Sequence, residues 1–254
     1  IDRYGDKIAY WQVVNERHLL RESPDVVRLF RERLPETSLG VSNCARWYSP
    51  HDGERRKRDL LRGIHDVQWL AGADTPVDFF GFHGHRPFGL WADLRVMYEA
   101  FDDCAEQGVR VHVSEFGIHR DHKITGGLRS GQWNAELQAE YYRTIFTVCF
   151  SHPQVDGINL WGMGPRTWMT GAGLLDENYE PTPAFDALKQ LITEEWRTRQ
   201  EGRLPLDGRL AFRGFHGDYR IEIGDSSAEF RVEPGSDNRV RLVWDRETQQ
   251  LRID

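Results

Sequence analysis

Short apolar runs alternate with longer amphipathic segments from the start of the chain to about residue 195. The apolar runs lie at residues 8–14, 39–42, 77–82, 109–113 and 155–160. Apolar residues recur with helical spacing in segments that include residues 26–34, 60–67, 94–104, 137–148 and 183–196. Short apolar runs predict buried strands, and a spacing of three to four residues predicts helices that cover them. This order of elements predicts an α/β fold with a parallel sheet.

The pattern changes to a period of two residues beyond Gly202. The apolar pairs two positions apart are Leu210/Phe212, Tyr219/Ile221, Phe230/Val232 and Leu242/Trp244, with Gly, Asp, Ser and Pro between them. This alternation is typical of strands that bury one face and are joined by tight turns. We therefore expect two domains: strand–helix repeats over residues 1–198 and a small antiparallel β appendage over residues 199–254.

The composition narrows the range of partners. The chain has 254 residues and a net charge of −7, which is the wrong sign for attracting nucleic-acid phosphates or anionic lipid. No stretch approaches the roughly 18 apolar residues of a membrane-spanning helix. The first residues lack the basic and apolar regions of a signal peptide, so we expect none in this stretch. A neutral partner is favoured over nucleic acid or a membrane.

Two residue counts bear on the chemistry. The three cysteines, Cys44, Cys104 and Cys149, are too few and too widely spaced for a disulfide framework or a paired-cysteine zinc site. We expect them to be small buried residues. The nine tryptophans exceed what burial alone usually requires, and flat aromatic faces stack well on sugar rings.

Two acidic residues come directly after predicted strands. Glu16 follows the first strand, and Glu115 follows the fourth. In barrels of parallel strands, catalytic residues project from this carboxyl-terminal rim. A facing pair of carboxyl groups suits glycoside hydrolysis, because one donates a proton to the leaving oxygen while the other stays ionised. The alternative is that each Glu caps a helix or pairs with an arginine such as Arg17 or Arg120.

The residues around these acids carry a family resemblance. Residues 10–16 read Tyr-Trp-Gln-Val-Val-Asn-Glu and resemble the acid/base strand of glycoside hydrolase family 10, the retaining endo-β-1,4-xylanases, usually spelled Trp-Asp-Val-Val-Asn-Glu. Further similar segments follow in the family's order at residues 82–85, 111–116, 160–162, 168 and 174–185. The resemblance covers roughly residues 1–195 and implies a (β/α)8 TIM barrel. Residues 212–219 resemble the β extension of plant-type members.

The resemblance implies catalytic roles for three residues. Glu16 is expected to be the general acid/base and Glu115 the nucleophile of a double displacement. The two carboxyl groups of such a retaining pair stand roughly 5 to 5.5 Å apart, so the charge on one helps to hold a proton on the other. Asn15 is expected to hydrogen-bond the sugar 2-hydroxyl group.

Further rim residues are assigned to substrate binding by the same resemblance. His85 is expected to orient the nucleophile, and His83 stands where the family has Gln. Trp161 and Trp168 are expected to wall the pocket around the sugar, although core packing is an equal alternative for either one. A zinc site would require the two histidines to converge with carboxylates or with further histidines, namely His119 and His122. We expect neither a metal nor a cofactor.

The sequence also departs from the family pattern. Gln12 replaces the family's Asp, and residues 42–44 differ from the usual segment, so the hydrogen bonds that support the acid/base are altered. Residues 164–166 differ from the family's last loop, which changes the wall that contacts the substrate. The predicted strands number five, whereas a closed barrel has eight. We expect an upstream segment or a second chain to supply the missing strand–helix units, because bare parallel edges invite pairing.

The expected function is retaining hydrolysis of internal β-1,4 linkages in xylan-like plant polysaccharides or their oligosaccharides. One alternative is another barrel glycosidase that acts on a different β-glycan. A second alternative is a non-catalytic glycan-binding protein or an inactive fragment. Since a polymer does not cross a membrane, we expect the protein to act as a secreted or cell-surface protein.

Overall fold

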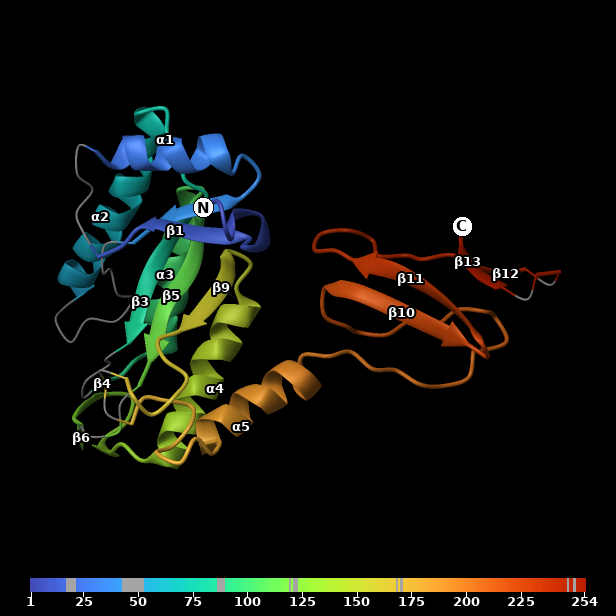
Figure 1. Cartoon of the computed structure of the whole chain (residues 1–254). Coiled ribbons are helices and arrows are strands. Elements are labelled where there is room, and N and C mark those ends of the chain that lie inside the picture. The colour runs from blue at the N-terminus through green and yellow to red at the C-terminus, as the bar shows by residue number, and fades with distance from the viewer. Residues whose placement is uncertain are drawn as a thin grey trace. The chain divides into compact units, whose positions relative to one another are not determined.

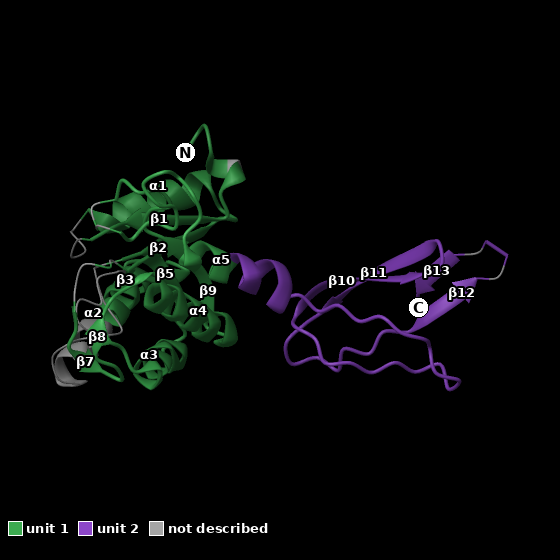
Figure 2. Ribbon diagram, turned by 90° about the horizontal axis from the view of Figure 1, so that it is seen from below, with its two compact units in different colours: residues 1–188 green, residues 189–254 purple. Residues whose placement is uncertain are grey.

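The chain forms two compact units, residues 1–188 and residues 189–254 (Figure 2). The computed structural model describes residues 1–16, 22–42, 53–85, 90–118, 120, 123–167, 169, 171–245, 247–248 and 250–254. The assignment of residues 1–198 to a barrel domain and residues 199–254 to an appendage stays a prediction.

The first unit contains most of the helices and strands (Figure 1). Its larger helices are α1 (Ser23–Arg33), α2 (Gly53–Gly72), α3 (Leu94–Glu106), α4 (Ala135–Ser151) and α5 (Pro183–Gln190). Its long strands are β1 (Tyr10–Val14), β2 (Ser38–Val41), β3 (Phe79–His85), β5 (Arg110–Gly117) and β9 (Val155–Leu160). Its shorter elements are η1 (Gly5–Lys7), β4 (Leu90–Trp91), β6 (Lys123–Ile124), β7 (Gly126–Gly127) and β8 (Gly131–Gln132). The last residues of α5 and the π-helical turn η2 (Leu191–Glu195) that follows it belong to the second unit.

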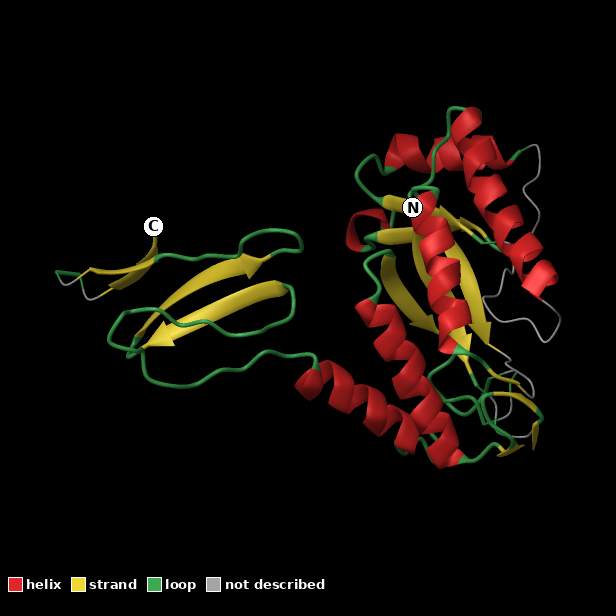
Figure 3. Ribbon diagram, turned by 180° about the vertical axis from the view of Figure 1, so that it is seen from behind, coloured by secondary structure: helices red, strands yellow, loops and turns green. Residues whose placement is uncertain are grey.

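The five long strands form one sheet in the order β1-β2-β3-β5-β9. Every neighbouring pair in it is parallel. A helix connects each strand to the next, which confirms the predicted strand–helix repeats. Figure 1 shows the strands of this sheet from one side, and the view from behind in Figure 3 shows helices in front of them. The helices therefore cover one face of the sheet.

Local sequence explains where the helices begin and end. Pro24 lies in the first turn of α1, where its missing N–H costs no hydrogen bond. The side chain of Asp93 accepts a hydrogen bond from the Arg95 amide at the start of α3. Asn134 caps α4 in the same manner. Gly108 has a φ of +70° just after α3 and lets the chain turn into β5 at little steric cost.

The core of the first unit lies between the sheet and the helices. Its fully buried side chains include Leu39, Leu70, Phe80, Phe82, Met97, Phe101, Phe116, Tyr141, Tyr142 and Ile145. Two predicted buried cysteines, Cys104 and Cys149, are indeed buried free thiols, and burial raises the pKa of Cys104 to about 12. Cys44 lies outside the described residues.

Three rings at the amino-terminal ends of the strands show that the sheet curves. Tyr10 in β1 lies 4.8 Å from His112 in β5, between ring centroids. Phe79 in β3 stacks on His112 at 3.9 Å with an interplanar angle of 15°. Since β2 and β3 stand between β1 and β5, a flat sheet would hold the backbones of β1 and β5 about 14 Å apart. The strands therefore follow an arc, as they do in a barrel.

The second unit contains two antiparallel hairpins. They are β10 (Gly217–Ile223) with β11 (Ser226–Val232), and β12 (Leu242–Asp245) with β13 (Gln250–Ile253). The predicted antiparallel appendage is confirmed, but the strand expected at Leu210 and Phe212 is wrong, because both residues lie in a loop with exposed side chains. The alternation there is only three residues long, and no neighbouring strand pairs with it in the described part of the chain. β13 was not predicted.

Among the described helices, none is both long and apolar enough to cross a membrane.

The contact between Gly40 and Phe79 provides a test of the sheet packing. A Cβ atom at Gly40 in β2 would lie 2.2 Å from the Phe79 ring, which His112 holds in place by stacking. We expect Gly40→Ala to lower the free energy of unfolding by about 1–3 kcal/mol, measured by urea denaturation.

Gly72→Ala is the matched control, because a Cβ atom at the end of α2 would have no neighbour within 4 Å. Alanine is the better helix former, so we expect no loss and a gain of up to about 1 kcal/mol. Equal destabilisation by the two substitutions would contradict the packing argument.

Candidate active site

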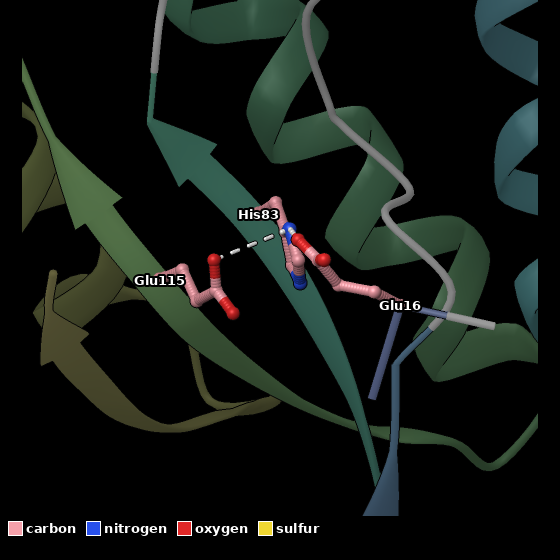
Figure 4. A group of neighbouring side chains, drawn as sticks. All are labelled: Glu16, His83 and Glu115. Carbon is pink, nitrogen blue, oxygen red and sulfur yellow. Dashed lines mark ion pairs between the residues drawn. The ribbon is translucent and has the colours of Figure 1, made fainter. Parts of the chain in front are cut away.

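Glu16, His83 and Glu115 meet at the carboxyl-terminal side of the sheet (Figure 4). Glu16 lies two residues after β1, His83 lies in β3, and Glu115 lies in β5. A carboxylate oxygen of each Glu and a ring nitrogen of His83 all lie within 4.8 Å of one another. The fold therefore brings together two acids that are 99 positions apart in the sequence.

A register shift in the sheet and an unusual backbone conformation at Glu16 set the directions of these side chains. The register of β3 against β5 shifts between Phe82 and His83, so that His83 stands opposite Glu115. Such bulges re-aim side chains and are common beside active sites. Glu16 has a φ of 57°, a left-handed conformation that costs a non-glycine residue roughly 1 kcal/mol or more.

The two carboxyl groups differ sharply in environment. The Glu115 side chain is 5% exposed, whereas that of Glu16 is 53% exposed. Nδ1 of His83 lies 3.5 Å from Oε2 of Glu115 and 3.7 Å from Oε1 of Glu16. Burial raises the pKa of Glu115, and the negative charge of Glu16 raises it further. A hydrogen bond from Asn15 acts in the opposite direction.

A short chain of side-chain amides leads to Glu115. Nε2 of Gln12 donates to Oδ1 of Asn15 at 2.6 Å. Nδ2 of Asn15 then donates to Oε1 of Glu115 at 3.4 Å. The first bond fixes the Asn15 amide with its donor toward the carboxylate. Gln12 was recognised from the sequence only as a departure from the family pattern, and this contact was missed.

Strand alternation explains why the contact was missed. Residues 12 and 15 of a regular strand would face opposite sides of the sheet. The register of β1 against β2 shifts between Gln12 and Val14, which brings Gln12 and Asn15 to the same side. A bulge of this kind leaves no signal in the hydrophobic pattern.

Two of the other predicted binding residues, Trp161 and His85, lie at the same rim. Trp161 directly follows β9, donates its backbone N–H to the Phe116 carbonyl at 2.7 Å, and has a partly exposed side chain. His85 is the last residue of β3 and pairs in register with Gly117, but its side chain lies outside the described structure. Trp168 also lies outside the described residues. The substrate contacts of these three residues stay predictions.

The same cluster has the donor set of a possible metal site. One imidazole nitrogen and two carboxylate oxygens come from Glu16, His83 and Glu115, and three such ligands suit a catalytic zinc ion. His119 and His122, the further ligands considered from the sequence, lie outside the described residues. A paired-carboxylate centre uses the same atoms without an ion, and the absence of a metal stays a prediction.

The family comparison decides the class of this chain. Residues 48–191 match the family model described as glycosyl hydrolase family 10. The chain belongs to glycosyl hydrolase family 10. The matched segment includes His83 and Glu115, whereas Glu16 lies before it. Membership confirms the resemblance that the motifs carried.

The chain matches only part of the length of each similar protein. An anti-sigma-I factor, RsgI6, of Acetivibrio thermocellus is 29% identical over 159 residues, which are 62% of this chain and 19% of that protein. Endo-1,4-beta-xylanase B of Thermotoga neapolitana is 31% identical over 146 residues, which are 52% of this chain and 39% of the xylanase. The chain thus spans between about one fifth and two fifths of these relatives.

A solved structure supports the fold. Xylanase 10B from Thermotoga petrophila in complex with xylobiose superimposes with a TM-score of 0.55 at 20% identity, covering 76% of this chain and 62% of that one. The predicted fold class is confirmed: the chain has the (β/α)8 barrel fold of its family, with five parallel strands and their helices in the described residues.

The buried position of Glu115 predicts a cost to stability. Its folded-state pKa lies above the ordinary value of 4.5, so the folded state holds this proton more tightly than the unfolded state. Proton binding by Glu115 therefore stabilises the folded state below about pH 4.5, and this contribution is lost as the pH rises through the folded-state pKa. We expect Glu115→Gln to raise the melting temperature at pH 7, by about 2–4 °C for each kcal/mol gained, with little change at pH 4.

Glu36→Gln is the control, because Glu36 is an exposed acid outside the site. Calorimetry at both pH values should show the pH-dependent gain for Glu115→Gln alone. A gain shared by Glu36→Gln, or one that is the same at pH 4 and pH 7, would rule out burial of the Glu115 charge as its cause.

Proposed function

We propose that this chain carries the acid/base and nucleophile of a retaining glycoside hydrolase that cleaves internal β-1,4 linkages in xylan-like polysaccharides. The separation of the two acids is the main support. Oxygens of Glu16 and Glu115 lie within 4.8 Å of each other. Retaining pairs stand about 5–5.5 Å apart, whereas inverting pairs are about 6.5–9.5 Å apart to make room for a water molecule.

The difference in exposure supports the proposed roles of the two acids. In the first step, a carboxylate oxygen of Glu115 bonds to the anomeric carbon, and the bond from that carbon to the leaving oxygen breaks. Glu16 donates the proton that the leaving oxygen needs. Its exposed side chain suits exchange of that proton with water, while the buried Glu115 suits direct attack on a sugar seated at the rim.

The second step reverses these roles. Water attacks the anomeric carbon, Glu16 accepts the proton from this water, and Glu115 leaves as a carboxylate. Glu115 must be ionised to attack, so burial works against it. The Asn15 amide donor supports the ionised form. In the proposed complex, Asn15 also hydrogen-bonds the sugar 2-hydroxyl group.

The proposed whole enzyme has a closed barrel. β1 and β9 each pair with one strand of the five-stranded sheet, and unpaired parallel edges are unusual in stable proteins. An upstream segment or a second chain supplies the three missing strand–helix units and completes the substrate crevice. Because the substrate is a polymer, the enzyme acts outside the cell or at its surface.

The nucleophile assignment is tested by trapping. We expect a 2-fluoro-xylobioside with a good leaving group to accumulate as a covalent adduct on Glu115 of the full-length protein, identified by peptide mass spectrometry. Glu115→Ala should remove the adduct and reduce xylan hydrolysis by at least about 10⁴-fold, with binding retained. A different labelled residue, or hydrolysis that survives the substitution, would refute the proposal. Binding of xylan by the unmutated protein without any hydrolysis would favour the non-catalytic alternative.

The role of Glu16 is tested by the leaving group. We expect Glu16→Ala to lower kcat/KM for xylan by about 10²- to 10⁴-fold, because the leaving sugar oxygen needs a proton. An aryl xylobioside with an acidic phenol needs little protonation, so its first step should fall much less. Asp2→Ala, a change at another exposed acid outside the site, is the control and should leave both rates unchanged. Equal losses on both substrates for Glu16→Ala would contradict the acid/base assignment.

A further inference from the structure

The second unit has a cavity of its own, with a volume of about 720 Å³. Both hairpins contribute to it. Its lining includes Asp225, Ser226, Ser227, Trp244, Thr248 and Gln250. Oγ of Ser226 accepts a hydrogen bond from the Leu251 amide at 2.7 Å, which ties the two hairpins together beside the cavity. The cavity is therefore part of the folded unit rather than a gap in a loop.

Trp244 is the large apolar residue of this cavity. It pairs across β12 and β13 with Leu251, which is 7% exposed, whereas Trp244 is 38% exposed. Within the described second unit, Leu251 and Leu191 are the buried apolar side chains. A unit with so small a core would gain stability by burying a tryptophan completely. A half-exposed indole beside a cavity is thus available for a ligand.

The polar lining indicates the chemistry of that ligand. Asp225 offers acceptors, Thr248 a hydroxyl group, and Gln250 both a donor and an acceptor. Residues 189–254 contain twelve basic and thirteen acidic residues, so the unit is nearly neutral and has no net attraction for a polyanion. An aromatic face with several neutral hydrogen-bonding groups matches a sugar ring, which has an apolar C–H face and a rim of hydroxyl groups.

We propose that this cavity is a second glycan-binding site, in which Trp244 stacks on a pyranose ring of a neutral polysaccharide. Only the identity of the glycan, a xylan-like chain, rests on the proposed function. Such a site keeps the enzyme on the polymer between cleavage events, because the second contact becomes intramolecular once the first is made.

Electrophoresis through gels with and without soluble xylan tests the site in the full-length protein. Glu115→Ala is the background, so that the polymer is not hydrolysed during the run. We expect Trp244→Ala to bind xylan at least tenfold more weakly than this background. Trp69→Ala is the matched control, because Trp69 in α2 is 39% exposed and lies outside the cavity. The Trp69→Ala variant should be retarded by xylan as much as the Glu115→Ala background.

A second variant protects the test against a folding defect. Gln250→Ala keeps the indole and removes one polar group, and we expect binding about threefold weaker. Xylan retardation that is unchanged in both Trp244→Ala and Gln250→Ala would overturn the proposal, as would equal losses in Trp244→Ala and Trp69→Ala. Binding is measured here without catalysis. Failure of Glu115 labelling therefore counts against the proposed function alone, and unchanged retardation counts against this site alone.

Discussion

The curvature of the parallel sheet is the constraint on which the candidate site depends. β1 and β5 are separated by two strands in the sheet order, a distance of about 14 Å if the sheet were flat. Their side chains nevertheless meet twice, at Tyr10 and His112 and again at Glu16 and Glu115. Because the sheet is curved, side chains from β1, or just after it, and from β5 come close together although the two strands are three positions apart in the sheet.

The same arrangement makes the two acids chemically different. β5 lies between β3 and β9, whereas β1 is at the end of the strand order. Glu115 is accordingly buried and Glu16 exposed. Burial opposes ionisation of Glu115, so the fold gives up stability near neutral pH to keep a carboxylate inside the site. The Asn15 donor offsets part of this cost, and Gln12 fixes its orientation.

The second unit follows a different rule. Its hairpins have few buried apolar residues, and Trp244 stays half exposed beside a cavity lined with polar groups. In the first unit, Trp91 and Trp133 are buried and stack on each other at 5.4 Å between ring centroids. The contrast separates tryptophans that hold a core together from one that is available to a ligand, which the tryptophan count alone did not do.

The sequence by itself determined the parallel strand–helix order, since apolar runs and helical spacing are local properties. It also pointed to Glu16 and Glu115, because each ends an apolar run within a family motif. Only the tertiary structure decided the rest. The bulge in β1 joins Gln12 to Asn15, burial separates the two acids, and Leu210 lies in a loop despite its alternating pattern. Register, burial and strand pairing depend on residues distant in sequence, so a local pattern does not contain them.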